Sequence, residues 1–330
     1  MLTIIIPIDL HYRASDIIKK CKLLLTNSEG KNVKFIFGHN NRNTKADKEF
    51  VKLFKNTSNS KLISAQFYSG EVNSSLLRNR AAAVVDTKYI CLLDIDIWFD
   101  FVILEKYYKR LITNCEPFYI IPCLYLTKLG SDLLIKKKIS SRKLIERYFS
   151  YSRKEFLHLA SPSSITIMNI EDYNSLDGFD EKYSGHGYED FDFLIRLLKK
   201  YNKLEYKNDF LSNNKARSPL FATGFRRYIG VFCLKLLLEK DIALHLHHEK
   251  APILNYTHAR KLNHELFSNK YSSYCTGKVD HDSSLITTFI KLCNENSYNL
   301  IDYSILFDNK PGHIDRFDTI KRRIRFLING

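Results

Sequence analysis

The chain has 330 residues, a formal net charge of +15 and a hydrophobic fraction of 45%. This composition excludes an intrinsically disordered chain, and the length suffices for one large α/β domain with an appendage or for two domains. The positive charge suits nucleic acid, anionic lipid or phosphorylated substrates and does not choose between them. The 7 cysteines are odd in number and form no C-x-x-C pair, which predicts reduced thiols in a cytosolic protein.

The two ends of the chain bear on its location. Met1–Arg13 has no basic start and only a brief apolar run, so we expect no signal peptide. No apolar stretch reaches the roughly 18–20 residues that span a bilayer. Ile320–Gly330 places apolar side chains among basic ones, which is typical of a tail that rests on an anionic membrane, although a solvated surface explains it equally well. We therefore expect a cytoplasmic protein, with peripheral attachment to the inner face of the cell membrane as an additional hypothesis.

Apolar runs alternate with amphipathic segments along most of the chain. Thr3–Ile8 is a continuous β-branched run, typical of a buried parallel strand, and Arg13–Leu25 has the spacing of an amphipathic helix. The predicted strands are Thr3–Ile8, Val33–Gly38, Lys61–Phe67, Tyr89–Asp96, Phe118–Leu126, Ser163–Asn169 and Ile242–His248. The predicted helices are Arg13–Leu25, Ser74–Val85, a helix after Phe101, a Lys-rich stretch over about residues 131–157, a helix from Phe191, Gly224–Lys240 and a helical C-terminal part. This alternation favours an open α/β sheet.

Two carboxylates end the strand predicted at Tyr89–Asp96. Ligands of an open α/β sheet bind beyond the carboxyl ends of its strands, and strand alternation places Asp94 and Asp96 on one side. Two carboxylates in that place can hold Mg²⁺ or Mn²⁺ against a diphosphate. The structural alternative is a pair of acids that begins a helix at Ile97.

Three further segments are candidates for ligand contact. The loop Pro7–Arg13 follows the first strand, and Arg78 and Arg80 precede the D-x-D sequence by about 15 residues. A planar guanidinium suits phosphate contact, and a solvated helical arginine is the alternative. Leu244–Lys250 carries three histidines after a short strand. An imidazole there could complete the coordination of a metal held by a carboxylate, and a packed or surface histidine is the alternative.

An acidic segment leads into one of the predicted helices. Glu189 and Asp190 fall in the first turn, where the helix dipole favours negative charge. Asp192 stands four residues before Arg196, as in an i,i+4 ion pair. These structural explanations cover Asp192 better than the other two acids. A Gly-x-Gly lead-in lets the backbone approach another group closely, and a carboxylate at the edge of a pocket is suited to deprotonating a hydroxyl.

The order of these motifs resembles that of the GT-A glycosyltransferases, and most closely that of bacterial family-2 enzymes of capsule and surface-polysaccharide synthesis. The segments that carry the likeness are TIIIPI, LLRNRAA, LLDIDIWF, GFDEKYSGHGYEDFDFLIRL and IALHLHH. Gly178–Leu197 is similar to the acceptor-side motif of β-1,4-galactosyltransferases and chondroitin-polymerase-type enzymes. It departs from the galactosyltransferase motif at His186 and Tyr188, which stand where that family usually has Trp and Gly, and at Phe191, which breaks the acidic run.

The resemblance implies a GT-A domain over residues 1–250, in which a Rossmann-like open mixed sheet is flanked by helices. The nucleotide-sugar half is expected at about residues 1–100 and the acceptor half at about residues 101–250. A helical C-terminal region is expected at residues 251–330.

On the donor side, the resemblance implies that Asp96 ligates Mn²⁺ or Mg²⁺ and that His245 is the downstream ligand. Asp94 is expected near the donor ribose and sugar, and Arg78 on the helix that approaches the nucleotide. Pro7 and Asp9 are expected to line the nucleotide base. The alternative metal ligands are Asp94, His248 and His247.

On the acceptor side, Asp190 matches the general base that takes the proton of the acceptor hydroxyl, and Glu189 matches the acid that orients the acceptor. The acceptor site implied by the motif also includes His186, Gly187 and Tyr188. The bulky rings within Tyr183–Phe193 are expected to stack on sugar rings.

The activity that follows is a metal-dependent, inverting transfer of a sugar from a UDP-sugar to an oligosaccharide or glycolipid acceptor, in capsule or other surface-polysaccharide synthesis. The positive charge and paired acids suggest one alternative, a metal-dependent nucleic-acid-processing enzyme. No nucleic-acid-binding signature occurs in the sequence, so we expect no nucleic-acid partner. The second alternative is a catalytically inactive polysaccharide-binding or scaffold protein, against which the intact acidic motifs argue.

Overall fold

In a computed structural model, the chain divides into two units, each assembled from three separate segments. Unit 1 comprises Met1–Tyr119, Ser164–Lys203 and Glu249–Lys270, and unit 2 comprises Ile120–Ser163, Leu204–His248 and Tyr271–Gly330. The structure describes residues 1–55, 57–113, 115–204, 208–213, 216, 218–249, 253–275, 284–308, 320, 324, 327 and 328. The segment predicted as a C-terminal region therefore contributes to both units.

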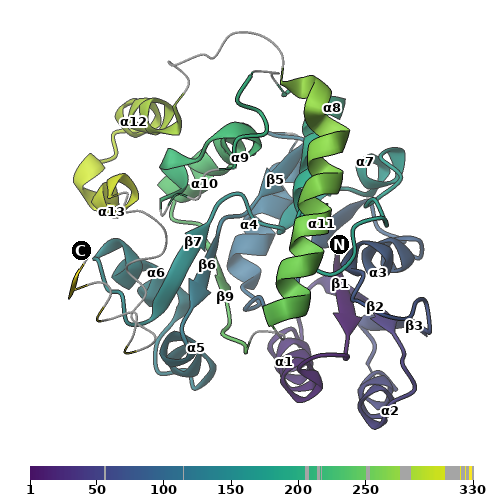
Figure 1. Ribbon diagram of the computed structural model, residues 1–330. Coiled ribbons are helices and arrows are strands. Elements are labelled where there is room, and N and C mark those ends of the chain that lie inside the picture. Colours follow the sequence, from purple (N-terminus) through teal and green to yellow (C-terminus); the bar gives the residue numbers. More distant parts are fainter. Residues whose placement is uncertain are drawn as a thin grey trace. The chain divides into compact units, whose positions relative to one another are not determined.

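The core of unit 1 is a six-stranded sheet with the strand order β3-β2-β1-β4-β8-β5 (Figure 1). Its strands are β1 (Leu2–Asp9), β2 (Val33–Asn40), β3 (Ser60–Ala65), β4 (Tyr89–Leu92), β5 (Phe118–Ile120) and β8 (Thr166–Asn169). The first four are parallel to one another, and β8 runs antiparallel to β4. Ile4, Ile5 and Ile6 are each 0% exposed. Both faces of β1 are therefore covered, as expected of a β-branched run in the middle of a parallel sheet.

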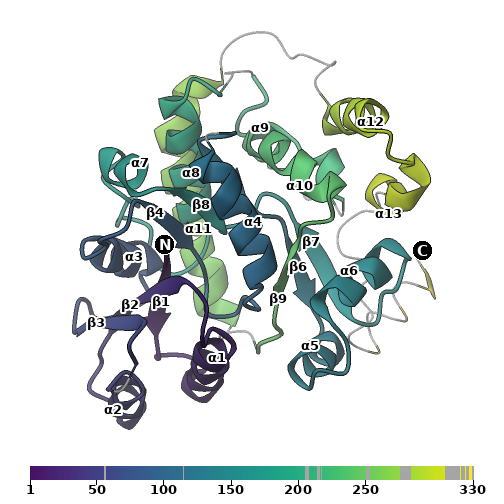
Figure 2. The same cartoon turned by 180° about the vertical axis from the view of Figure 1, so that it is seen from behind.

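Helices flank the sheet of unit 1. They are α1 (Ala14–Asn27), α2 (Lys45–Lys52), α3 (Ser74–Ala82), α4 (Phe101–Ile112), α7 (Ile170–Ser175), α8 (Glu189–Lys200) and α11 (Ile253–Tyr271). The side chains of Thr44, Asn73 and Asp100 accept hydrogen bonds from backbone N–H groups at the start of α2, α3 and α4. These caps satisfy donors that the first helical turn leaves unpaired. Figures 1 and 2, which view the chain from opposite sides, place α11 on one side of this sheet and α4 on the other.

Unit 2 contains a three-stranded sheet with the order β7-β6-β9. Its strands are β6 (Cys123–Leu126), β7 (Phe156–Ala160), antiparallel to β6, and β9 (Ala243–His245), parallel to β6. Its helices are α5 (Lys128–Ile135), α6 (Ser141–Phe149), α9 (Gly224–Gly230), α10 (Leu234–Leu238), α12 (Leu285–Glu295) and α13 (Ser304–Phe307), with short 3₁₀ turns η1 (Pro219–Phe221), η2 (Val231–Cys233), η3 (Ser272–Tyr274) and η4 (Leu300–Tyr303). Tyr303, 1% exposed, packs against Phe149 and Phe289 and donates its hydroxyl to the carbonyl of Leu238.

Two predicted strands differ from the observed ones. The run Phe118–Leu126 is not one strand but two, β5 and β6, which belong to different sheets. Pro122 lies between them; it has no N–H to donate to a ladder, and its carbonyl accepts a hydrogen bond from Ala243 of β9. The strand predicted at Tyr89–Asp96 ends at Leu92, because the chain turns and the N–H of Ile97 donates to the carbonyl of Asp94.

Two predicted helices are also divided. Gly224–Lys240 forms α9, the turn η2 and α10, which Gly230 and the 3₁₀ turn separate. The Lys-rich stretch over residues 131–157 contains parts of α5 and α6 and the start of β7. Helical periodicity was present in both stretches, but it did not locate the interruptions.

Within the described ranges, no helix combines the length and the apolar character that a membrane-spanning segment requires. The amphipathic tail predicted at Ile320–Gly330 lies largely outside the described residues. Four of its residues are described, Ile320, Ile324, Leu327 and Ile328, and all four are exposed.

Candidate active site

Polar residues gather where the strands of unit 1 end. β1, β2 and β4 are parallel, so their carboxyl ends share one edge of the sheet, and antiparallel β8 begins there, with Thr166 opposite Leu92. Asp94 follows β4 at this edge. The hydroxyl of Ser164, just before β8, donates a hydrogen bond of 3.0 Å to Asp94 Oδ2. Ser164 was not predicted as a site residue, because only the antiparallel pairing of β4 and β8 brings it to Asp94.

A buried arginine joins the D-x-D sequence to the acidic segment of α8. Arg78 of α3 is 2% exposed. Its Nη2 lies 2.7 Å from Asp94 Oδ1, and its Nη1 lies 3.2 Å from Asp190 Oδ1. The ring of Phe179 lies 4.8 Å below the guanidinium and contributes a cation–π contact. Arg78 was predicted to contact the nucleotide, but its guanidinium instead binds two carboxylates, one from each predicted half of the site.

The acidic turn that begins α8 raises the proton affinity of Asp190. Burial and the neighbouring charge of Glu189 raise the pKa of Asp190 to about 8, with Asp94 adding to the rise and Arg78 opposing it. The side chain of Asp190 nevertheless remains 28% exposed. Glu189 has one buried carboxylate oxygen, Oε2, without a hydrogen-bond partner among the described residues. A partly accessible carboxylate whose pKa lies near neutrality can accept a proton from a substrate hydroxyl.

The loop before α8 is held by α11. The side-chain amide of Asn263, 4% exposed, donates to the carbonyls of Ser184 and Gly187 at 2.9 and 3.0 Å. Gly185 has φ +76°, and a Cβ at this position would lie 2.4 Å from the Cβ of Ala259. The Gly-x-Gly lead-in was expected to let the backbone approach another group closely, and the group observed beside Gly185 is a helix of the same unit.

Several aromatic residues predicted at the acceptor site are buried. Tyr188 is 4% exposed, with the guanidinium of Arg260 over its ring and Phe267 of α11 beside it. Tyr183 and Phe193 are 2% and 1% exposed. The predicted stacking of these three rings on sugars, and with it the acceptor contact of Tyr188, is therefore wrong, because the rings form part of the core.

The other acceptor-side residues lie as follows. His186 is exposed, and Gly187 has φ +94°. Asp192 is 0% exposed and forms ion pairs with Arg196 at 2.9 Å and with Lys270 at 2.7 Å. The predicted structural role of Asp192 is confirmed, and α11 adds a second partner that the sequence did not reveal.

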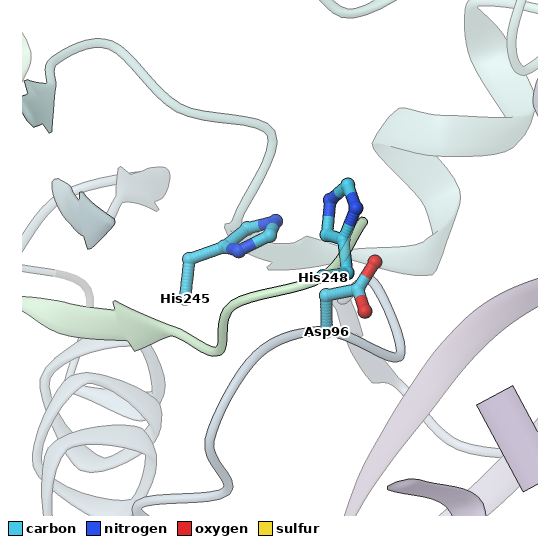
Figure 3. Close-up of side chains that lie close together, drawn as sticks. All are labelled: Asp96, His245 and His248. Atoms are coloured by element: carbon cyan, nitrogen blue, oxygen red, sulfur yellow. The ribbon is translucent and has the colours of Figure 1, made fainter. Parts of the chain in front are cut away.

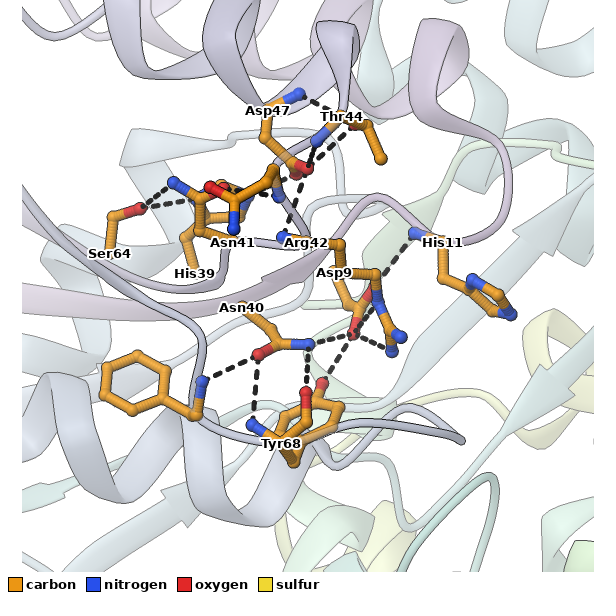
Figure 4. A network of polar contacts seen from close by, with 12 residues as sticks. Asp9, His11, His39, Asn40, Asn41, Arg42, Thr44, Asp47, Ser64 and Tyr68 are labelled. Atoms are coloured by element: carbon orange, nitrogen blue, oxygen red, sulfur yellow. Dashed lines mark hydrogen bonds and ion pairs between the residues drawn. The ribbon is translucent and has the colours of Figure 1, made fainter.

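A polar network surrounds Asp9 at the end of β1 (Figure 4). The carboxylate of Asp9 accepts hydrogen bonds from the guanidinium of Arg42, the hydroxyl of Tyr68 at 2.7 Å and the amide of Asn40. Burial raises the pKa of Asp9, but the hydrogen bonds from Arg42 and Tyr68 outweigh it and hold the pKa below its usual range. Pro7, predicted beside the nucleotide base, lies within β1 opposite Gly38.

The same edge contains a buried histidine that was not predicted. His39 of β2, 0% exposed, contacts Ser64 at Nδ1 and Asp47 at Nε2. Asp47 also accepts a hydrogen bond from the N–H of Arg42. Burial lowers the pKa of His39 despite the neighbouring Asp47. The network thus fixes the loop that presents Arg42 to Asp9.

Asp96, the second acid of the D-x-D sequence, has different partners. It is 6% exposed, and its two oxygens accept hydrogen bonds from Arg13 and Lys20. Arg13 precedes α1 and Lys20 lies within it. Arg13 ends the loop Pro7–Arg13, which was a candidate for ligand contact, but neither cation was predicted to bind Asp96, because the contacts join residues separated by 83 and 76 positions in the sequence.

The candidate histidines of unit 2 follow β9. The ring of His245 stacks on that of Tyr125, with centroids 4.0 Å apart, and its Nδ1 lies 2.8 Å from the carbonyl of Leu246. With the proton on Nδ1, the lone pair for a metal is on Nε2. The ring of His248 lies 5.3 Å from that of His245, whereas His247 is bound through its backbone N–H to Ser131.

Figure 3 draws Asp96 on the loop after β4, and His245 and His248 on the segment that includes the end of β9. A carboxylate and two imidazoles are donors that suit Mn²⁺, and the carboxylate alone suits Mg²⁺. The donor types therefore fit the predicted ion.

Residues 3–273 match the protein family described as glycosyltransferase like family 2. Because the match covers most of the chain, the chain belongs to this family and is a glycosyltransferase by class, as the motif order predicted. The mixed α/β architecture of the GT-A type is also confirmed. No curated protein matches the chain.

Several solved structures are similar at low identity. TarS 1–349 from S. aureus in complex with UDP-GlcNAc is 13% identical, with 76% of this chain and 56% of that chain covered and a TM-score of 0.39. TarS 1–349 in complex with UDP is 15% identical, with coverages of 60% and 55% and a TM-score of 0.40. Glucosyl-3-phosphoglycerate synthase from Mycobacterium tuberculosis, in complex with Mn²⁺, UDP and glucosyl-3-phosphoglycerate, is 13% identical, with coverages of 85% and 81% and a TM-score of 0.43. The chain thus spans little more than half the length of the TarS chains that it matches.

Proposed function

We propose that the chain transfers a sugar from a UDP-sugar to an oligosaccharide or glycolipid acceptor in the synthesis of a capsule or another surface polysaccharide. The observation that carries the proposal is the bridge from Asp94 through Arg78 to Asp190. It joins the carboxylate at the end of β4, on the expected donor side, to the carboxylate of the acceptor motif. A structural ion pair would require only one carboxylate beside Arg78. A transfer site requires the groups that bind the donor and the acceptor to lie close together, as the two carboxylates at Arg78 do.

The proposed reaction is a single displacement with inversion. Asp190 takes the proton of the acceptor hydroxyl while that oxygen forms a bond to the anomeric carbon, and the bond from this carbon to the UDP oxygen breaks on the opposite face. The charge of Glu189 and the partial burial of Asp190 increase the basicity of the Asp190 carboxylate. Arg78 holds the orientation of that carboxylate. Glu189 is proposed to orient the acceptor, with His186 and Gly187 on the preceding loop nearby in sequence.

On the donor side, Asp96 and His245 are proposed as ligands of Mn²⁺ or Mg²⁺, with Asp94, His248 and His247 as alternatives. When bound, the ion would neutralise the charge that develops on the departing diphosphate. Asp9 and Pro7 are proposed near the nucleotide base. The Asp9 network would serve there as a rigid support, because its carboxylate already has several hydrogen-bond donors. Peripheral binding to an anionic membrane through Ile320–Gly330 stays a prediction.

The test is a screen of UDP-sugars with Mn²⁺, in which products are identified by mass spectrometry, together with the variant Asp190→Asn. This variant should bind UDP almost normally and reduce transfer by about 10²–10⁴-fold, because it loses the base and leaves the donor side intact. Asp100→Asn is the matched control, since asparagine keeps the cap of α4. Near-normal transfer by Asp190→Asn would remove this residue from the mechanism, and no metal-dependent binding of UDP by the wild type would contradict the proposed donor.

A further inference from the structure

The carboxylate proposed as a metal ligand is neutralised by two cations of its own unit. Lys20 Nζ lies 2.7 Å from Asp96 Oδ1, and Arg13 Nη1 and Nη2 lie 3.1 and 3.0 Å from Oδ1 and Oδ2. The side chains of Lys20 and Asp96 are only 6% and 9% exposed. Both carboxylate oxygens therefore accept charge-assisted hydrogen bonds where water screens them weakly.

The backbone of Arg13 is in an uncommon conformation. Its φ and ψ are 58° and 31°, in the left-handed region, and its side chain does not cap α1. A non-glycine residue in this region costs on the order of 1 kcal/mol. The conformation is found together with the bidentate contact to Asp96.

A second carboxylate, that of Asp16, also forms ion pairs with both cations. Asp16 Oδ2 lies 3.0 Å from Arg13 Nη1 and 3.0 Å from Lys20 Nζ, and its side chain is 38% exposed. Arg13 directly precedes α1, and Asp16 and Lys20 lie in its first two turns, so Asp16 pairs with Arg13 at i,i+3 and with Lys20 at i,i+4 spacing. Arg13 and Lys20 can therefore leave Asp96 and still retain a counter-ion, which lowers the free energy required for an exchange.

A metal ion ligated by Asp96 would stand about 2.0–2.6 Å from a carboxylate oxygen. Both oxygens already accept N–H groups from the two cations, so a divalent ion at Asp96 would compete with Arg13 and Lys20 for the same carboxylate. We propose that Arg13 and Lys20 are exchangeable counter-ions of Asp96. They neutralise it in the metal-free enzyme, a divalent cation must displace them, and their released charges then bind the diphosphate of the donor. This inference rests on the proposed function for the identities of the metal and the donor.

The exchange predicts opposite effects on two ligands, which can be measured by binding alone. Trp98 is the only tryptophan of the chain and stands two residues after Asp96, so quenching of its fluorescence by Mn²⁺ reports metal binding. Lys20→Met should bind Mn²⁺ on the order of tenfold more tightly and, with Mn²⁺ saturating, should bind UDP more weakly by a similar factor. Lys22→Met is the matched control, because Lys22 is 53% exposed and pairs with Glu49; it should change neither affinity.

Arg13→Asn provides a second variant in case Lys20→Met does not fold, because asparagine tolerates the left-handed region. It should shift the two affinities in the same directions as Lys20→Met. Unchanged or weaker Mn²⁺ binding by the folded variants, or unchanged UDP binding, would overturn the exchange while leaving the proposed function standing. A wild type that binds Mn²⁺ but never UDP would instead contradict the proposed function.

Discussion

Asp94 and Asp96 are separated by one residue, yet they have different surroundings. Asp94 binds the buried guanidinium of Arg78 from α3, and its side chain is 36% exposed. Asp96 binds Lys20 of α1, and its side chain is 9% exposed. β4 ends at Leu92, so the two acids lie in a turn and no longer alternate as strand residues do. D-x-D spacing therefore does not by itself place two carboxylates in one site.

The two acids bind positive charge in two different arrangements. On the Asp94 side, one fixed guanidinium joins two carboxylates that come from distant parts of the sequence. On the Asp96 side, two cations share two carboxylates, of which Asp16 is the more exposed. We expect the first arrangement to be rigid and needed for folding, and the second to exchange partners. The following predictions test that contrast.

The largest effect is expected on the Asp94 side. Arg78→Gln should lower the free energy of unfolding by about 3–5 kcal/mol, because it leaves Asp94 and Asp190 without their buried cation. Urea unfolding measures this change. Arg80→Gln is the control, since Arg80 is an exposed residue of the same helix and should change stability by less than about 0.5 kcal/mol. Equal stability of the two variants would show that the bridge contributes little.

An intermediate effect is expected where α11 holds the acceptor loop. Asn263→Ala removes the amide that donates to the carbonyls of Ser184 and Gly187 and should cost about 1–3 kcal/mol of stability. Because this loop leads into Asp190, the variant should also raise the KM for the acceptor while Mn²⁺ binding at Asp96 stays unchanged. Leu262→Ala, at a position 51% exposed on the same helix, is the control. A normal acceptor KM in stable Asn263→Ala would mean that the loop keeps its position without this amide.

A third effect is a pH dependence confined to the Asp94 side. The pKa of Asp190 is raised in the folded state, so this group binds more protons folded than unfolded between its usual value of 3.8 and about 8. Its contribution to stability is therefore present below pH 3.8 and is lost as the pH rises through about 8. Asp190→Asn should become more stable relative to the wild type as the pH is raised from acid to alkaline. A difference independent of pH would contradict the raised pKa.

Sequence patterns predicted the local features well. The β-branched run that became β1 and the first turn of α8 were recognisable because burial on both faces and helical spacing leave local signals. The pair Asp192–Arg196 was also predictable, because its partners are four residues apart. For β1 and for the pair Asp192–Arg196, the local signal was sufficient.

The features of the site that the sequence did not predict depend on contacts between distant segments. Arg78 meets Asp190 across 112 positions, and Asn263 meets Gly187 across 76. No periodicity reports such pairs. The glycines before α8 were expected to be points of close approach, but only the packing of α11 identifies the neighbours, which are Ala259 for Gly185 and Arg260 for Gly187. The contact with the acceptor that was predicted for Tyr188 failed for the same reason, because the sequence of the loop does not indicate that α11 buries this ring.

The central claim is that Asp190 is a carboxylate of raised pKa that serves as the base of sugar transfer. The pH dependence of kcat/KM tests it most directly, because this ratio reports the pKa of the essential base in the free enzyme. We predict that kcat/KM for the acceptor rises with pH to a plateau, with a midpoint near 8. A ratio that is already constant above about pH 5, as expected of a carboxylate with an ordinary pKa, would contradict the claim.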